Sequence, residues 1–138
     1  MELSNVHWVA VAVSALVGIA SGAIWFGPKT FYPLWWKAMG HAEGEIPGAG
    51  MNMGIVFGST FFAQFVQATG LALVISMLSE PSGFKGGIVG LVVGVGIAAA
   101  SSLGHRLFGG HGFKVWAIEI SNDVLNLFLM GIILGAWR

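Results

Sequence analysis

The chain has 138 residues, with six basic and six acidic side chains for a formal net charge of zero, and it contains no cysteine. Charged residues make up 9% of the chain and hydrophobic residues 56%, whereas about a quarter of an ordinary soluble domain is charged. So few ionic groups exclude a soluble globule, and the absence of a basic excess excludes a nucleic-acid binder. Without cysteine, disulfides, thiolate metal sites and cysteine nucleophiles are also excluded. An integral membrane protein fits this composition.

Four apolar segments follow one another along the chain. Each is long enough to cross a hydrocarbon core about 30 Å thick at about 1.5 Å per residue. We expect helices, because lipid leaves backbone polar groups no partner outside the segment itself. The predicted spans are residues 6–26, 54–78, 86–103 and 115–137.

Aromatic side chains are concentrated just after the first span, in residues 31–39, which are predicted to form a short interfacial helix. The predicted fold is therefore an all-α integral membrane protein. It is a single membrane domain over residues 1–138, with four transmembrane helices in a bundle plus the interfacial helix.

Tryptophans mark the predicted membrane boundaries, because indole rings favour the headgroup level. They stand near the ends of the first and fourth spans and in the interfacial helix, at Trp8, Trp25, Trp35, Trp36, Trp116 and Trp137.

The basic residues predict the orientation. Four lie on the side of the two larger loops and two on the side of the termini. This bias places the termini on the non-cytoplasmic side of a bacterial inner membrane, and the margin of two charges leaves dual topology open.

Small residues recur every four positions within the apolar segments. Such spacing lets helix backbones approach closely in lipid, where little hydrophobic force acts between helices. Two interpretations are open: packing within the chain, or contact with a second copy or another membrane subunit. The candidate packing residues are Gly18, Gly22, Gly86, Gly90, Gly94, Gly131 and Gly135.

The fourth span carries an unusual polar face, formed by Glu119, Asn122, Asp123 and Asn126 at i, i+3, i+4 and i+7. An Asp at the centre of a span costs roughly 3 kcal/mol, so Asp123 is expected to face the bundle interior and to have partners there.

The second span offers partners at a similar depth. Thr60, Gln64 and Gln67 share one of its faces, and we expect this face to meet the polar face of the fourth span. The cluster is either a structural hydrogen-bond network or a site linked to protons or cations.

Histidines form a weaker pattern. His41, His105 and His111 are predicted to lie on one side of the membrane, but their spacing matches no zinc motif. We interpret them as loop or interface residues, and whether they bind anything stays open. Nucleophile elbows and phosphate-binding loops are absent. No catalytic residue, metal or cofactor is therefore expected, and an enzyme is not predicted.

Three motifs resemble a known family. The segment Gly22-Ala23-Ile24-Trp25-Phe26-Gly27-Pro28, followed by Phe31, Trp35 or Trp36 and Gly40, is similar to a Gly-x-x-Trp-Tyr-Ser-Pro segment with later Phe, Trp and Gly. The end of the chain, Leu129-Met130-Gly131-Ile132-Ile133-Leu134-Gly135-Ala136-Trp137, is similar to a closing Met-Gly-x-Ile-Leu-Gly-x-Trp run, and Leu107-Phe108 to a loop motif. All three occur in domain-of-unknown-function family seventeen sixty-one, small four-span bacterial membrane proteins.

The resemblance implies four helices and no established activity. The chain departs from the family where a Tyr-His pair often stands in the last span, because it has Asn122-Asp123 there. A role for that family histidine therefore cannot be carried over unchanged.

Two functions follow from these features. The first is a non-enzymatic structural or accessory subunit that packs into a homo-oligomer or a larger membrane complex, with the lipid bilayer and other membrane subunits as partners and no nucleic acid. The alternative is a small proton- or cation-coupled transporter or channel that uses Asp123. A third function, an intramembrane enzyme or haem protein using the histidines, is less favoured than these two.

Overall fold

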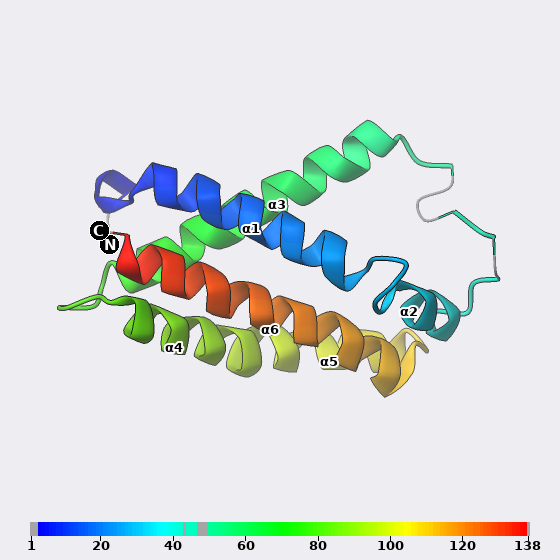
Figure 1. Ribbon diagram of the computed structural model, residues 1–138. Helices are drawn as coiled ribbons and strands as arrows, with labels where there is room; N and C mark the ends of the chain where they lie inside the picture. The colour runs from blue at the N-terminus through cyan, green and yellow to red at the C-terminus, as the bar shows by residue number, and fades with distance from the viewer. Residues whose placement is uncertain (1–2, 43, 47–49, 138) are drawn as a thin grey trace.

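The computed structural model describes residues 3–42, 44–46 and 50–137, and secondary structure within these residues is helical throughout. Four stretches are long and apolar enough to cross a membrane. They are α1 (Trp8–Trp25), α3 (Met53–Ile75), the stretch Gly83–Phe108 and α6 (Gly112–Ala136). Two short elements, η1 (Leu3–Asn5) and α2 (Tyr32–Ala38), precede and follow α1 (Figure 1). The all-α prediction with four apolar spans is confirmed.

Local chemistry explains where the helices begin. His7 accepts a hydrogen bond from the backbone of Ala10 at the start of α1, Asn52 caps α3, and Ser82 accepts from Lys85 at the start of the third span. The structure places the helix after α1 at Tyr32–Ala38, within the predicted residues 31–39.

The third membrane-spanning stretch consists of three helical segments: α4 (Gly83–Val93), the π-helical η2 (Gly94–Ala99) and α5 (Ala100–Phe108). It extends past the predicted residues 86–103 at both ends. At the end of η2, the Ala99 carbonyl accepts hydrogen bonds from the Trp116 indole (3.0 Å) and the Ser102 hydroxyl (3.3 Å). These two side chains stabilise a carbonyl in the part of the span that departs from α-helical geometry.

The closest helix pair in the bundle is α4 with α6, and glycines make this contact possible. A Cβ atom on Gly86 would overlap the Gly131 carbonyl oxygen, and one on Gly90 would overlap the Leu127 carbonyl oxygen. Gly135 is equally close to the Ser82 carbonyl. Because the neighbouring atoms are backbone, the two helices touch without side chains between them.

The remaining predicted packing glycines also face neighbours in the same chain. Gly94 lies against Val124, Gly22 against the Asn122 side chain, and Gly18 against Gln64 and Met130. Of the two interpretations open for this set of glycines, the structure therefore supports packing within the chain.

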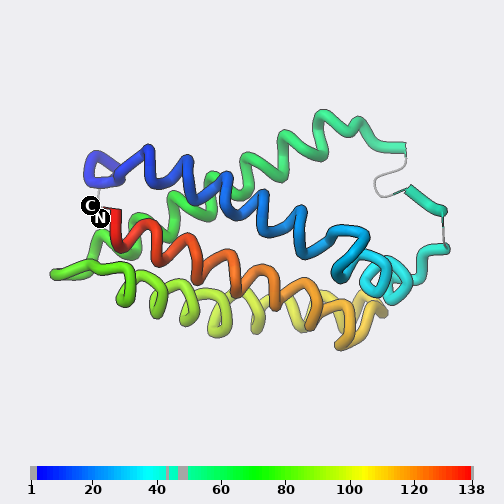
Figure 2. Tube along the Cα trace, in the orientation of Figure 1, coloured from blue at the N-terminus to red at the C-terminus, as the bar shows by residue number. Residues whose placement is uncertain are grey.

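The packed core lies at the end of the bundle where the two chain termini meet (Figures 1 and 2). It includes Val11 of α1, Ile75 of α3, and Leu127, Met130 and Leu134 of α6. The first half of α3 leaves the bundle, as Figure 2 shows, and its large apolar side chains are exposed there, including Ile55, Phe57, Phe61 and Phe62. The bundle is thus closed at the terminal end and spread at the opposite end.

Candidate functional site

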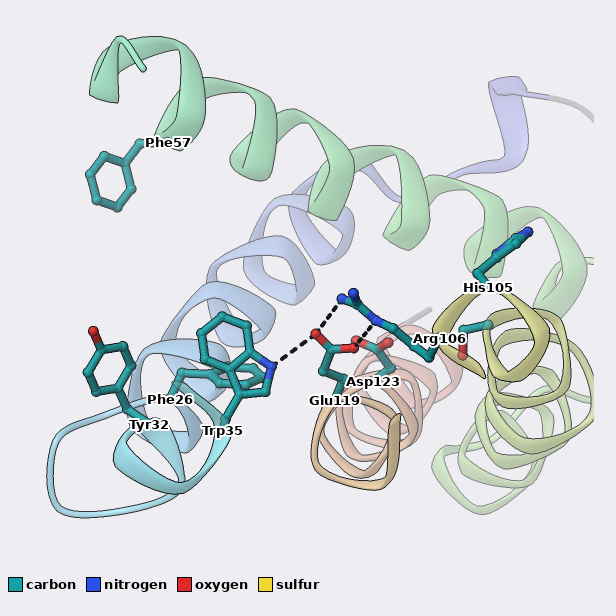
Figure 3. Close-up of a pocket in the computed structure, with 9 residues that line it drawn as sticks. Phe26, Tyr32, Trp35, Phe57, His105, Arg106, Glu119 and Asp123 are labelled. Atoms are coloured by element: carbon teal, nitrogen blue, oxygen red, sulfur yellow. Dashed lines mark hydrogen bonds and ion pairs between the residues drawn. The ribbon is translucent and has the colours of Figure 1, made fainter. Parts of the chain in front are cut away.

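A cavity of about 860 Å³ lies at the spread end of the bundle. Helices α2, α3, α5 and α6 contribute to its wall, together with Phe26, the residue that follows α1 (Figure 3). The lining residues are Phe26, Tyr32, Trp35, Phe57, Ser102, His105, Arg106, Glu119 and Asp123. Four aromatic rings and three charged groups therefore share one space among otherwise apolar helices.

Glu119 accepts three hydrogen bonds in the cavity wall. The Arg106 guanidinium donates from Nε to Glu119 Oε1 and from Nη2 to Oε2, both at 2.6 Å, and the Trp35 indole donates to Oε2 at 3.0 Å. Figure 3 shows Trp35 and Arg106 reaching Glu119 from different sides. Arg106 also lies 3.3 Å from His111 Nδ1. This two-pronged arrangement is the strong form of an ion pair, and it compensates the charge of Glu119.

The short connection between α5 and α6 brings this pair together. Gly109 and Gly110 end α5, with Gly110 at φ 79°, a conformation that favours glycine. The chain turns back at once, so α5 and α6 pack as an antiparallel hairpin and Arg106 faces Glu119 across it. The sequence did not indicate this partner of Glu119, because Arg106 falls in a predicted loop and was considered only for the orientation of the chain.

Asp123 lies one helical turn beyond Glu119 on α6 and lines the same cavity. Within the described part of the chain its carboxylate has no hydrogen bond and no ion pair. Since Glu119 is already neutralised by Arg106, Asp123 gives the cavity an excess of one formal negative charge.

The two asparagines of the predicted polar face point away from this cavity. Asn122 is buried and donates to the Ser21 hydroxyl of α1 at 3.2 Å. Asn126 is 2% exposed, and its Oδ1 has no partner among the described residues. The face predicted for α6 therefore divides, with the acids at the cavity and the amides towards the interior.

The polar face predicted for α3 also divides. Thr60 is exposed and donates to the Val56 carbonyl of its own helix at 2.8 Å. Gln64 lies against Gly18 of α1, and Gln67 lines a separate cavity of about 200 Å³ beside Leu127. Because α3 diverges from the bundle, the structure does not gather these three residues around Asp123.

The three candidate histidines do not converge. His41 stacks on Trp36 with ring centroids 3.8 Å apart and contacts Glu45 at 2.7 Å, His105 lines the cavity, and His111 contacts Arg106. The described residues contain no cluster of three or more histidine, cysteine or acidic side chains able to hold a metal ion.

Several predicted interfacial tryptophans have partners inside the chain. Trp25 donates to the Ile118 carbonyl at 2.9 Å, Trp8 stacks on Phe65, and the Trp137 ring packs against His7. Trp35 donates to Glu119, and Trp116 donates to the Ala99 carbonyl. Together with Trp25, these two indoles position α1, α2 and η2 against the start of α6. The other aromatic residues of the cavity, Phe26, Tyr32 and Phe57, were not predicted as site residues.

The family of the chain follows from a comparison with family models. The model described as Protein of unknown function (DUF1761) matches residues 9–135. The chain therefore belongs to this family, which confirms the resemblance seen in its end motifs. No curated protein and no solved structure matches the chain.

Proposed function

We propose that this four-span member of a family with no assigned activity is a small transporter that binds a cationic substrate at Asp123. The observation that carries the proposal is a carboxylate without a partner in the described chain, facing an aromatic-lined cavity between membrane-spanning helices. Acidic groups within spans are costly, and they typically mark substrate or ion pathways.

The charge of the cavity supports a monovalent cation. Arg106 offsets Glu119, while Asp123 has no such counterpart. Aromatic faces add attraction for organic cations, worth about 0.5–2 kcal/mol for each well-placed ring. Tyr32 and Trp35 of α2 supply such rings, as does Phe26 directly after α1. A lipophilic amine or quaternary ammonium ion matches this combination of one negative charge and several rings.

The uneven packing of the bundle supports transport over simple binding. The core near the termini is closed by buried apolar side chains, whereas the cavity lies at the other end. A substrate in this conformation would reach Asp123 at the end of the bundle where α2 lies. Transport would require a second conformation in which the terminal end opens, as alternating access demands.

The accessory-subunit role predicted from the sequence remains a second candidate. The glycines that suggested it pack within the chain, but another row of small residues faces outwards. A Cβ on Gly96 or Gly104 would meet nothing within 4 Å, and Ala100 between them is exposed. This row would suit a second copy of the chain, as small-residue contacts between membrane helices do.

The transporter proposal predicts that Asp123→Asn weakens cation binding. The probe is tetraphenylphosphonium, and binding to purified protein in mild detergent is followed by tryptophan fluorescence, since Trp35 lines the cavity. The variant removes the uncompensated charge with little change in shape, so we expect at least a tenfold weaker affinity, equal to about 1.4 kcal/mol.

The matched control is Ser121→Ala, on the same helix. The Ser121 side chain donates to the Ala117 carbonyl of α6 and lies outside the cavity lining, so its variant should bind like the wild type. Equal affinity in Asp123→Asn and wild type would overturn the proposal. Uptake of tetraphenylphosphonium into proteoliposomes then tests transport. Native mass spectrometry tests the subunit role, because it detects further copies or partner proteins bound in a fixed ratio.

A further inference from the structure

An apolar groove with a volume of about 200 Å³ lies between α3, the third span and α6. Apart from Gln67, every residue that lines it is apolar, and the lining includes Gly70 of α3, Ile97 and Ala98 of η2, and Leu127 of α6. Spaces lined by apolar groups bind hydrocarbon, whereas a polar group placed there without a hydrogen-bond partner loses free energy. The groove therefore suits a hydrocarbon chain.

The register of the helices places this groove beside Asp123. The third span and α6 run antiparallel (Figure 1), and Gly94 lies against Val124 where they pack together. Ile97, about one turn beyond Gly94, therefore lies level with the turn of α6 that ends at Asp123. From there the groove extends to Leu127, which is one turn beyond Asp123 on the same face of α6.

The cavity at Asp123 and the groove are lined by the same three stretches of the bundle, namely α3, the third span and α6. In the third span, Ser102 lines the cavity and Ala98, four residues earlier, lines the groove. On α6, Asp123 lines the cavity and Leu127, four residues later, lines the groove and belongs to the packed core. The two spaces therefore follow one another along the bundle, with the charged one towards α2 and the apolar one deeper.

This order matches the way an amphiphile lies in one leaflet of a bilayer. Its charged head stays at the headgroup level, where the aromatic residues of α2 are expected, and its hydrocarbon chain points towards the middle of the membrane. The rim of the groove is open, because Val74 is 40% exposed and Ile97 63% exposed. In a membrane these residues face lipid, so an alkyl chain can enter the groove sideways while its head moves to Asp123.

We infer that the groove is an alkyl-chain subsite and that the cationic substrate is a single-chain amphiphile. Its ammonium group lies at Asp123 and its chain lies in the groove beside Leu127. The inference rests on the proposed function, because Asp123 fixes the position of the head. It narrows the substrate class from lipophilic cations in general to those that carry an unbranched alkyl chain. The acyl chain of a bilayer lipid is the competing occupant, and it would not depend on the charge of Asp123.

The test compares decyltrimethylammonium with two cations that lack a chain, tetramethylammonium and tetraphenylphosphonium, in the wild type and in Gly70→Leu. A Cβ on Gly70 meets nothing within 4 Å, so the fold accommodates leucine, whose side chain then occupies the groove. Affinities are measured by calorimetric titration at one detergent concentration, so partitioning into micelles cancels in the ratio of variant to wild type. We expect Gly70→Leu to bind decyltrimethylammonium about fourfold more weakly, as if one methylene group had lost its burial, and to bind both chainless cations like the wild type.

Gly58→Leu is the matched control on the same helix. A Cβ on Gly58 also meets nothing within 4 Å, and this residue lines neither the cavity nor the groove. The variant should bind decyltrimethylammonium like the wild type, and a loss equal to that of Gly70→Leu would overturn the inference by assigning the effect to the lipid-facing surface in general. Asp123→Asn should weaken the binding of all three cations, because each carries its charge into the same cavity.

Three further results would each contradict the alkyl-chain subsite. The first is equal affinity of Gly70→Leu and the wild type for decyltrimethylammonium. The second is an equal loss for the chainless cations in Gly70→Leu, because leucine would then act on the cavity or the fold. The third is decyltrimethylammonium binding that depends on Gly70 but not on Asp123, because the groove would then hold the acyl chain of a bilayer lipid. Failure of the proposed function is distinguishable, since tetraphenylphosphonium would then bind Asp123→Asn as tightly as the wild type.

Discussion

Gly131→Ala is expected to lower the free energy of unfolding by about 3 kcal/mol, at the upper end of the cost of overpacking. The new methyl group would overlap the Gly86 carbonyl oxygen at the contact between α4 and α6. Because the obstacle is backbone, no side-chain rotation relieves the overlap, and the helices must move apart along their length. The measurement is equilibrium unfolding in mixed detergent micelles, followed by circular dichroism.

Gly70→Ala on α3 is the matched control, since a Cβ there meets nothing within 4 Å. Alanine is favoured over glycine in a helix interior by about 1 kcal/mol, so this variant should be as stable as the wild type or slightly more stable. If Gly131→Ala unfolded at the same denaturant concentration as Gly70→Ala, the close backbone contact between α4 and α6 would be refuted.

The spans could be predicted because the bilayer imposes a simple rule on each segment separately. Length and low charge are local properties, so α1, α3 and α6 appear in the sequence close to their observed limits. The limits of the third span depend on a neighbouring helix as well as on its own residues. Its last residues, Ala100–Phe108, include a histidine and an arginine, and they stay helical beyond the apolar run because α5 packs against α6.

The glycine spacing predicted close packing but could not identify the partner. Gly86 and Gly90 are equally compatible with another subunit or with α6 when only the sequence is read. The choice depends on helix arrangement, and the structure shows these glycines against the backbones of Gly131 and Leu127.

The site was predicted only in part, because its residues come from different helices. The helical period correctly marks Asp123 and Glu119 as neighbours on one face. It cannot show that Arg106 reaches Glu119 across the turn at Gly109 and Gly110. A basic residue shortly before a glycine turn and an acid shortly after it is the signal that was available.

The expected meeting of the α3 and α6 polar faces failed for a geometrical reason. Equal depth was estimated as if all four helices were parallel, but α3 crosses the bundle at an angle (Figure 2). Thr60 therefore lies outside, while Gln64, one turn later, reaches the interior beside Gly18. A small change of position along a tilted helix thus decides between exposure and burial.

Breaking the pair of Arg106 and Glu119 should be the second large effect. Arg106→Ala leaves the Glu119 carboxylate without its counter-charge in a wall where that side chain is 21% exposed. Removing one partner of a fully buried pair costs about 3–5 kcal/mol, and partial exposure reduces this to about 2 kcal/mol. The same variant adds a second uncompensated acid beside Asp123, so tetraphenylphosphonium should bind severalfold more tightly even though the protein is less stable.

The double variant with Arg106→Ala and Glu119→Gln separates charge from packing. The glutamine retains an oxygen that can accept from Trp35, and it removes the acid that Arg106→Ala leaves unpaired. We therefore expect the double variant to recover about half of the lost stability and to return cation affinity to the wild-type value. Additive losses of stability in this double-mutant cycle would show that the two residues do not interact. Unchanged affinity in Arg106→Ala would show that the cavity does not sense the charge of Glu119.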